Sequence, residues 1–258
     1  MRKSFVGGSA AGLLLLGLSM LATLSTSARA AQQIAVPSYI YPGAAWSQIE
    51  GGAPAVRIAI VNPASGPGDT ADPNYKRQIA ETRSHGIQVI GYVDTAYAKR
   101  DIAAVERDMS TYETWYGVDG FLFDEASSSA DKIPYYATLH DYVLKLNPKA
   151  ITVLNPGNET DEGYLKVANI ILTFEGSYAD YVAKYQAPNW VTRYPSSRFW
   201  HVVYDAHSAA DMENAVALSK ARHAGWVYVT PLGLPDPYDK MPDVDYWSTE
   251  VHDASAGK

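Results

Sequence analysis

The chain has 258 residues, with 21 Lys and Arg against 28 Asp and Glu, no Cys, 19 Tyr and 6 Trp. The formal net charge of −7 disfavours nucleic-acid binding, which needs a basic face, and the lack of Cys excludes a disulfide-stabilised fold. Tyr and Trp combine an apolar ring with a polar tip, which suits the faces and hydroxyls of sugars. This composition favours a carbohydrate ligand.

Residues 1–30 have the pattern of a secretory signal peptide. Arg2 and Lys3 precede an apolar run from Leu13 to Leu24, and Ala28-Arg29-Ala30 matches an A-x-A cleavage signal. A transmembrane anchor is the alternative, but a membrane span needs about 20 apolar residues. We therefore expect a secreted protein, extracellular or periplasmic, without stable membrane insertion. Its single domain would span residues 31–258.

Eight apolar runs rich in β-formers follow the signal, and most are continuous rather than alternating, as in parallel strands covered on both faces. They are Ile34–Tyr41, Arg57–Asn62, Gln88–Asp94, Val118–Asp124, Ala150–Asn155, Asn169–Glu175, Arg198–Asp205 and Gly225–Thr230.

Helical patterns separate these runs and cover Pro73–Ser84, Asp101–Trp115, Lys132–Leu146 and Ala209–His223. The segments before the second and sixth strands are short and weakly helical, and the tail after Trp247 is expected to be loosely attached. The alternation predicts a single α/β domain, a (β/α)8 TIM barrel. A doubly wound open sheet is the alternative, but the chain has no G-x-G-x-x-G after its first strand and no P-loop motif.

Carboxylates end two of the predicted strands. Gly120-Phe121-Leu122-Phe123 runs into Asp124-Glu125, and Ile170–Phe174 runs into Glu175. Because strand C-termini meet at one mouth of a barrel, these groups are candidates for the acid/base pair of a glycoside hydrolase. Neighbouring strand residues face opposite sides, so parity with Leu122 points Asp124 inward and leaves Glu125 in the loop. Alternatively, Asp124 caps a helix or pairs with a cation, and Glu175 only bonds its neighbours.

Other polar residues at or near strand ends are candidates for substrate binding. They are Tyr41, Asn62, Tyr92, Asp94, Tyr97, Asn155, Tyr178, Asp205 and Tyr228. Asn62 and Asn155 each precede Pro, which holds them extended, although a turn could use either side chain for its own backbone. The six His show no metal-ligand spacing and no Ser lies in a G-x-S-x-G elbow, so we expect no metal, no cofactor and no Ser triad.

Six segments resemble the spherulin-4-like family of glycoside hydrolases, in order and over nearly all of the mature chain. They are Tyr39–Gly43, Ile60–Gly68, Gly91–Tyr97, Gly117–Glu125, Val153–Gly157 and Phe174–Tyr178. The resemblance implies a (β/α)8 barrel that cuts α-1,4-linked N-acetylgalactosamine in exopolysaccharides such as galactosaminogalactan. It also implies that Asp124 and Glu125 are the paired acidic residues after the fourth strand, and Glu175 the acidic residue after the sixth.

The leading hypothesis is a monomeric, endo-acting glycosidase on a galactosamine-containing exopolysaccharide. Asp124 is the nucleophile, Glu175 the general acid and base, and Glu125 orients the sugar or tunes the other two. Asp124 and Glu125 could exchange roles, and the choice between retention and inversion depends on the carboxylate separation. A non-catalytic carbohydrate-binding or matrix-associated protein is the main alternative, since a fold does not guarantee activity. A different sugar hydrolase or a deacetylase is a third.

Overall fold

The computed structural model describes residues 1, 4 and 31–257. Its strands form one closed parallel barrel in chain order, with β1 pairing β8, so the predicted (β/α)8 barrel is confirmed. The strands are β1 (Gln33–Ser38), β2 (Val56–Val61), β3 (Gln88–Asp94), β4 (Gly120–Asp124), β5 (Ile151–Leu154), β6 (Ile170–Ser177), β7 (Phe199–Tyr204) and β8 (Trp226–Val229).

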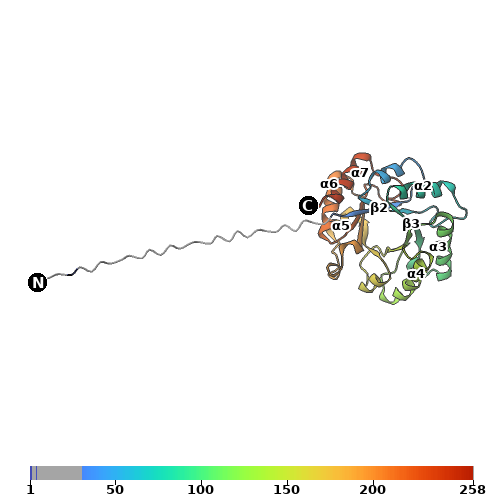
Figure 1. Ribbon diagram of the computed structural model, residues 1–258, viewed down its shortest axis with the longest axis horizontal. Helices are drawn as coiled ribbons and strands as arrows, with labels where there is room; N and C mark the ends of the chain where they lie inside the picture. The colour runs from blue at the N-terminus through green and yellow to red at the C-terminus, as the bar shows by residue number, and fades with distance from the viewer. Residues whose placement is uncertain (2–3, 5–30, 258) are drawn as a thin grey trace.

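Helices surround the barrel, with α2, α3 and α4 on one side and α5, α6 and α7 on the other (Figure 1). The fifth connection carries the short 3-10 helix η3 (Glu162–Lys166) instead of an α-helix, which explains the weak helical pattern before the sixth strand. The α-helices are α1 (Trp46–Gly51), α2 (Pro73–Ser84), α3 (Ile102–Tyr116), α4 (Ile133–Leu146), α5 (Tyr178–Ala183), α6 (Ala209–Ala221) and α7 (Val244–Ser255).

Local signals set the helix ends close to their predicted positions. The Asp72 carboxylate accepts the N–H of Asn74 at the start of α2, where Pro73 takes the first helical position. α3 ends at Gly117, which adopts the left-handed conformation at φ 59° that glycine tolerates best. Such caps supply partners for backbone groups that a helix end leaves unpaired.

The C-terminal helix α7 is an integral part of the barrel, so the prediction of a loosely attached tail is wrong. Trp247 is 4 % exposed and Glu250 is 0 % exposed. β1 and β8 pair at only two positions, and Glu250 Oε1 accepts the N–H of Val229 at 2.7 Å beside that short ladder. A carboxyl from α7 thus replaces a strand partner where the barrel closes.

A polar aromatic cluster is buried around β6 and β7. The hydroxyls of Tyr181 and Tyr185 lie 2.8 and 3.1 Å from Nδ1 and Nε2 of His201, and the Thr173 hydroxyl lies 3.1 Å from Nε2. The ring of His201 is 0 % exposed. Its burial, with the nearby Arg222 charge, lowers the pKa of His201 to about 3.

The signal-peptide prediction rests on residues 2–3 and 5–30, which lie outside the described residues. Among the helices of residues 1, 4 and 31–257, none is long and apolar enough to cross a membrane.

Candidate active site

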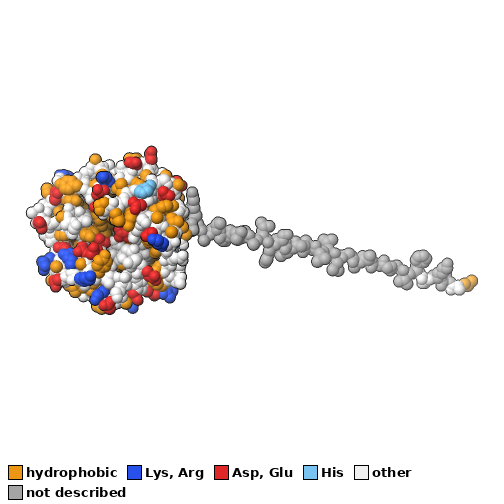
Figure 2. Space-filling model, turned by 180° about the vertical axis from the view of Figure 1, so that it is seen from behind, with side chains coloured by type: hydrophobic (Ala, Val, Ile, Leu, Met, Phe, Trp, Pro, Cys, Tyr) orange, Lys and Arg blue, Asp and Glu red, His pale blue; other side chains and the backbone are white. Residues whose placement is uncertain are grey.

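The carboxyl ends of the strands surround a cavity of about 440 Å³. Figure 2 shows Asp and Glu side chains gathered near the middle of one face of the molecule. Nine residues line the cavity: Tyr97, Asp124, Glu125, Asn155, Pro156, Gly157, Glu175, Tyr204 and Leu234. All three predicted catalytic carboxylates therefore lie in one cavity, with two of the predicted substrate-binding residues, Tyr97 and Asn155.

Asn155 joins the two strand-end carboxylates. Its Nδ2 donates to Asp124 Oδ1 at 2.7 Å and to Glu175 Oε2 at 2.5 Å. Because one nitrogen contacts both oxygens, they lie no further apart than these two distances together, about 5.2 Å. Asn155 is 8 % exposed and follows β5, between the strands that carry the two carboxylates.

Each carboxylate also accepts a tyrosine hydroxyl on its other oxygen. Tyr92 donates to Asp124 Oδ2 at 2.9 Å, and Tyr238 donates to Glu175 Oε1 at 2.5 Å. Tyr39 lies between these two phenols, with its ring edge-on to each at 5.5 Å between centroids. The result is a continuous chain of hydrogen bonds, Tyr92–Asp124–Asn155–Glu175–Tyr238, over an aromatic support.

The environment raises the pKa of both carboxyl groups. Burial is the main cause for Asp124, opposed by hydrogen bonds from Tyr92, the Glu125 backbone and Asn155. Burial also raises the pKa of Glu175, the negative charge of Asp124 adds to the effect, and Tyr238 and Asn155 oppose it. Burial and the two carboxylates raise the pKa of Tyr39. Burial and Asp124 raise the pKa of Tyr92, and burial and Glu175 raise the pKa of Tyr238, so all three phenols stay protonated.

Glu125 leaves the strand by a left-handed turn, with φ 46°. Its side chain is exposed at the cavity, whereas Asp124 is half-buried, as alternation from Leu122 predicts. The Thr95 hydroxyl donates to the carbonyls of Asp124 and Glu125 at 2.9 and 3.0 Å and fixes this turn. Partial desolvation, followed by the charges of Asp94 and Asp124, raises the pKa of Glu125.

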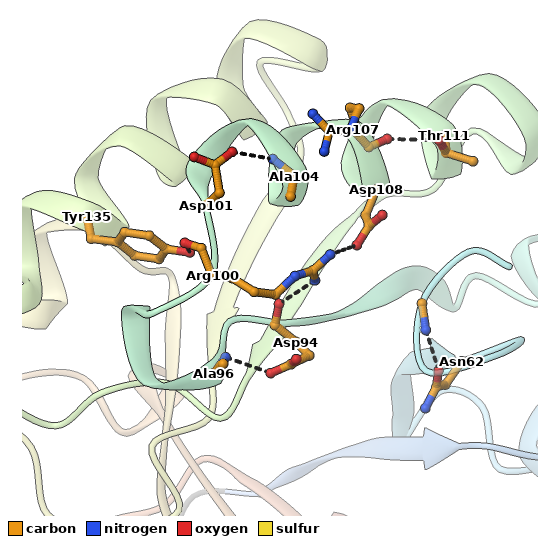
Figure 3. Close-up of polar contacts among 11 residues, drawn as sticks. Asn62, Asp94, Ala96, Arg100, Asp101, Ala104, Arg107, Asp108, Thr111 and Tyr135 are labelled. Carbon is orange, nitrogen blue, oxygen red and sulfur yellow. Dashed lines mark hydrogen bonds and ion pairs between the residues drawn. The ribbon is translucent and has the colours of Figure 1, made fainter. Parts of the chain in front are cut away.

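Asp94 shapes the neighbouring rim. Its Oδ1 accepts the N–H of Ala96 at 2.7 Å, and Arg100 donates to its carbonyl while pairing with Asp108 (Figure 3). This network supports three consecutive left-handed residues, Ala96 to Ala98, at φ 44°, 56° and 63°. The turn presents Tyr97, 51 % exposed, at the cavity. Asp94 therefore organises the wall beside Glu125 and is not itself among the lining residues.

Tyr41, Asn62, Tyr178, Asp205 and Tyr228 are not among the residues that line the cavity. Tyr41 contacts Asp72 and Asn74, and Tyr178 accepts from Asn214. The Asn62 side chain accepts the N–H of Gly66, the turn role that was the alternative from sequence. Tyr228 is 0 % exposed and packs against Trp247, so it is not among the residues that line the cavity. Asp205 is half-buried beside the lining residue Tyr204.

Sequence reasoning missed several residues of the site. Tyr238 belongs to the loop after β8 and lies 63 positions from its partner Glu175, so no local pattern connects the two. Tyr204 and Leu234 line the cavity, and Leu234 is 70 % exposed. Tyr39 was also missed. The sequence offered one signal for Tyr39 and Tyr204, which is that both lie close to the end of a predicted strand.

Among the described residues, no group of three or more His, Cys, Asp or Glu side chains could hold a metal ion. The groups on hand for chemistry are carboxylates, a carboxamide and phenols. Paired carboxylates of this kind can donate a proton, accept one, or attack an electrophilic carbon.

A model of the spherulation-specific family 4, Spherulin4, matches residues 33–254. The chain belongs to this family. It is 35 % identical over 191 residues to Spherulin-4 of Physarum polycephalum, a match that covers 72 % of this chain and 57 % of that protein. The chain thus matches little more than half the length of this relative.

Solved structures share the barrel fold of this chain. Sph3 of Aspergillus clavatus, solved in complex with GalNAc, superposes with a TM-score of 0.77 and is 30 % identical, over 88 % of this chain and 98 % of Sph3. A chitinase of Chromobacterium violaceum, 12 % identical, has a TM-score of 0.55 over 88 % of this chain and 100 % of its own, and shows the fold alone. The chain therefore has a glycoside hydrolase-like barrel.

Proposed function

We propose that the chain is a secreted, endo-acting glycoside hydrolase that cleaves α-1,4-linked N-acetylgalactosamine or galactosamine polysaccharide. The observation that carries this proposal is the Asn155 bridge, which holds one oxygen of each carboxylate within about 5.2 Å of the other. Retaining glycosidases separate their carboxyl groups by about 5–5.5 Å, whereas inverting enzymes need about 6.5–9.5 Å to admit a water. The geometry favours retention.

In the first step Asp124 attacks the anomeric carbon, and the bond to the leaving sugar breaks as Glu175 gives its proton to the departing oxygen. In the second step Glu175 takes a proton from water, which displaces Asp124 from the anomeric carbon. The environment favours this division of roles. Asp124 accepts three donors and Glu175 two, and the Asp124 charge raises the pKa of Glu175, so a proton shared by the pair resides on Glu175.

The substrate assignment rests on the family relationship and on the rim of the cavity. Sph3, which was solved with GalNAc, is the similar structure that points to this sugar. Tyr97 and Leu234 offer exposed apolar surface to a sugar face, and Glu125 offers a carboxylate to its hydroxyl or nitrogen substituents. We take the monomer as the catalytic unit in this proposal. The pattern of residues 1–30 supports secretion.

The test is the release of reducing ends by the mature protein from α-1,4-linked N-acetylgalactosamine polymer, acetylated in one sample and partly deacetylated in a parallel one. Asp124→Asn and Glu175→Gln are each expected to lose at least about 10³-fold in kcat while keeping the wild-type thermal transition. Binding without cleavage by the wild type would establish the non-catalytic alternative. NMR of the first product is expected to show the α-anomer, and the β-anomer would refute retention.

A further inference from the structure

A second depression, of about 520 Å³, lies beside the catalytic cavity. Its volume falls in the range typical of ligand sites, about 300–1,000 Å³. It is lined by Ser128, Ala130, Glu159, Thr160, Asp161, Glu162 and Trp190. None of these residues takes part in the chain of hydrogen bonds between Asp124 and Glu175.

One loop joins the depression to the catalytic cavity. Asn155, Pro156 and Gly157 line the cavity, and the depression begins two residues later at Glu159. Because consecutive Cα atoms are about 3.8 Å apart, the Cα atoms of Gly157 and Glu159 are separated by at most roughly 7.6 Å. A polymer that leaves the catalytic cavity over this loop therefore reaches the depression directly.

Trp190 provides a fixed aromatic surface in the depression. Its ring packs edge-on against the rings of Phe199 and Tyr194, with 5.6 and 6.3 Å between ring centroids, and these contacts fix its orientation. The side chain is only half-buried, so the remaining ring surface opens into the depression. An immobilised indole with a free face gives a sugar a stacking surface at little entropic cost, since no side chain has to be ordered on binding.

Carboxylates line the same depression as this ring. Glu159 is exposed and forms no hydrogen bond or ion pair within the described part of the chain. Asp161 uses Oδ1 for the N–H of Gly163. Arg193 and Tyr194 both donate hydrogen bonds to the Glu162 carboxylate, so this carboxylate anchors the loop and is not free for a ligand. Free carboxylate oxygens beside an aromatic face suit sugar hydroxyls and, more strongly, the ammonium of a deacetylated amino sugar.

We propose that this depression is a second sugar-binding subsite, which takes an amino-sugar unit of the polysaccharide remote from the bond that is cleaved. Trp190 stacks on the sugar and Glu159 accepts from its nitrogen or hydroxyl substituents. The inference rests on the proposed function for its choice of ligand. It extends that function by explaining how the enzyme would hold a long chain and act within it.

The test separates binding from cleavage. Trp190→Ala, Trp190→Phe and Glu159→Gln are compared with wild type by electrophoresis in gels that contain the partly deacetylated polymer, and by kcat/KM on this polymer and on a trisaccharide. Trp115, a half-exposed tryptophan of α3 that lines a different depression, provides the matched control Trp115→Ala. Thermal melts verify that each variant is folded.

We expect Trp190→Ala to weaken retardation in the gel and to lower the ratio of kcat/KM on polymer to that on trisaccharide about tenfold, which corresponds to about 1.4 kcal/mol. Trp190→Phe should keep most of the binding, and Glu159→Gln should weaken binding of the deacetylated polymer more than that of the acetylated one. Equal retardation of wild type and a folded Trp190→Ala, or an equal loss in Trp115→Ala, would refute the subsite. Retardation of wild type without cleavage would refute only the hydrolase.

Discussion

Replacing Tyr238 by Phe tests whether Glu175 is the general acid. The Tyr238 hydroxyl donates to Glu175 Oε1 at 2.5 Å, and the residue is 6 % exposed. Phe keeps the ring against Tyr39 and Tyr228, at 5.5 and 6.2 Å between centroids, and removes only the donor. The substitution therefore affects only how strongly the ionised form of Glu175 is stabilised.

The size of the effect follows from the lost hydrogen bond. A hydrogen bond to a charged group contributes about 1.5–3 kcal/mol. One pKa unit corresponds to about 1.36 kcal/mol, so the pKa of Glu175 should rise by about 1–2 units. The donor stabilises the ionised form, and its removal favours the protonated form. Glu175 then keeps its acidic proton to higher pH, and the alkaline limb of kcat/KM should move up by about 1–2 pH units.

The assay is the pH profile of kcat/KM for wild type and three single variants. Tyr92→Phe removes the equivalent donor from Asp124, which must be ionised to attack, so its acidic limb should move up instead. Tyr39→Phe is the control, because within the described residues its hydroxyl donates to neither carboxylate. If Tyr238→Phe moved the acidic limb and left the alkaline limb in place, the roles of Asp124 and Glu175 would be reversed.

Two buried groups away from the cavity give predictions on stability. Burial raises the pKa of Glu250, so the native state keeps a proton that the unfolded chain loses above about pH 4.5, and stability falls as the pH rises. Glu250→Gln should therefore raise Tm at pH 8 and leave it nearly unchanged at pH 4; an equal gain at both values would contradict this reasoning. His201, with its pKa lowered to about 3, resists protonation that the unfolded chain accepts below about pH 6.5. Urea unfolding should show wild-type stability declining from pH 6.5 towards pH 4, and a flatter decline in His201→Gln even though that variant is less stable at pH 7.

The sequence was sufficient for the barrel and for the central carboxylates. Continuous apolar runs separated by capped helices specify parallel strands, and parallel strands in a barrel deliver their carboxyl ends to one mouth. Asp124 ends β4, Asn155 follows β5 and Glu175 lies near the end of β6, and these three strands are neighbours in the closed sheet. Their proximity is therefore a consequence of strand order, which the sequence already contains.

The same reasoning gives no information on side-chain direction or on the path of a long loop. Tyr228 sits on a strand near its end, but it is buried with Trp247 rather than directed to the cavity. Tyr41 follows β1 and then extends to Asp72 and Asn74 on the outer rim. Tyr238 reaches Glu175 from the loop between β8 and α7, whose path depends on tertiary packing that no local periodicity records.

The two left-handed turns at the cavity show most clearly why local rules cannot predict this wall. Ala, Tyr and Glu rarely adopt positive φ, yet Ala96, Tyr97, Ala98 and Glu125 all do so. Such conformations cost free energy and persist only where surrounding contacts fix them. Here each turn supports the other, since Tyr97 N–H donates to the Glu125 carbonyl at 2.6 Å and the Thr95 hydroxyl contacts the carbonyls of both Asp124 and Glu125. Because those contacts join the ends of the neighbouring strands β3 and β4, the strain at one turn is compensated by residues about 30 positions away, and only the folded chain brings the two together.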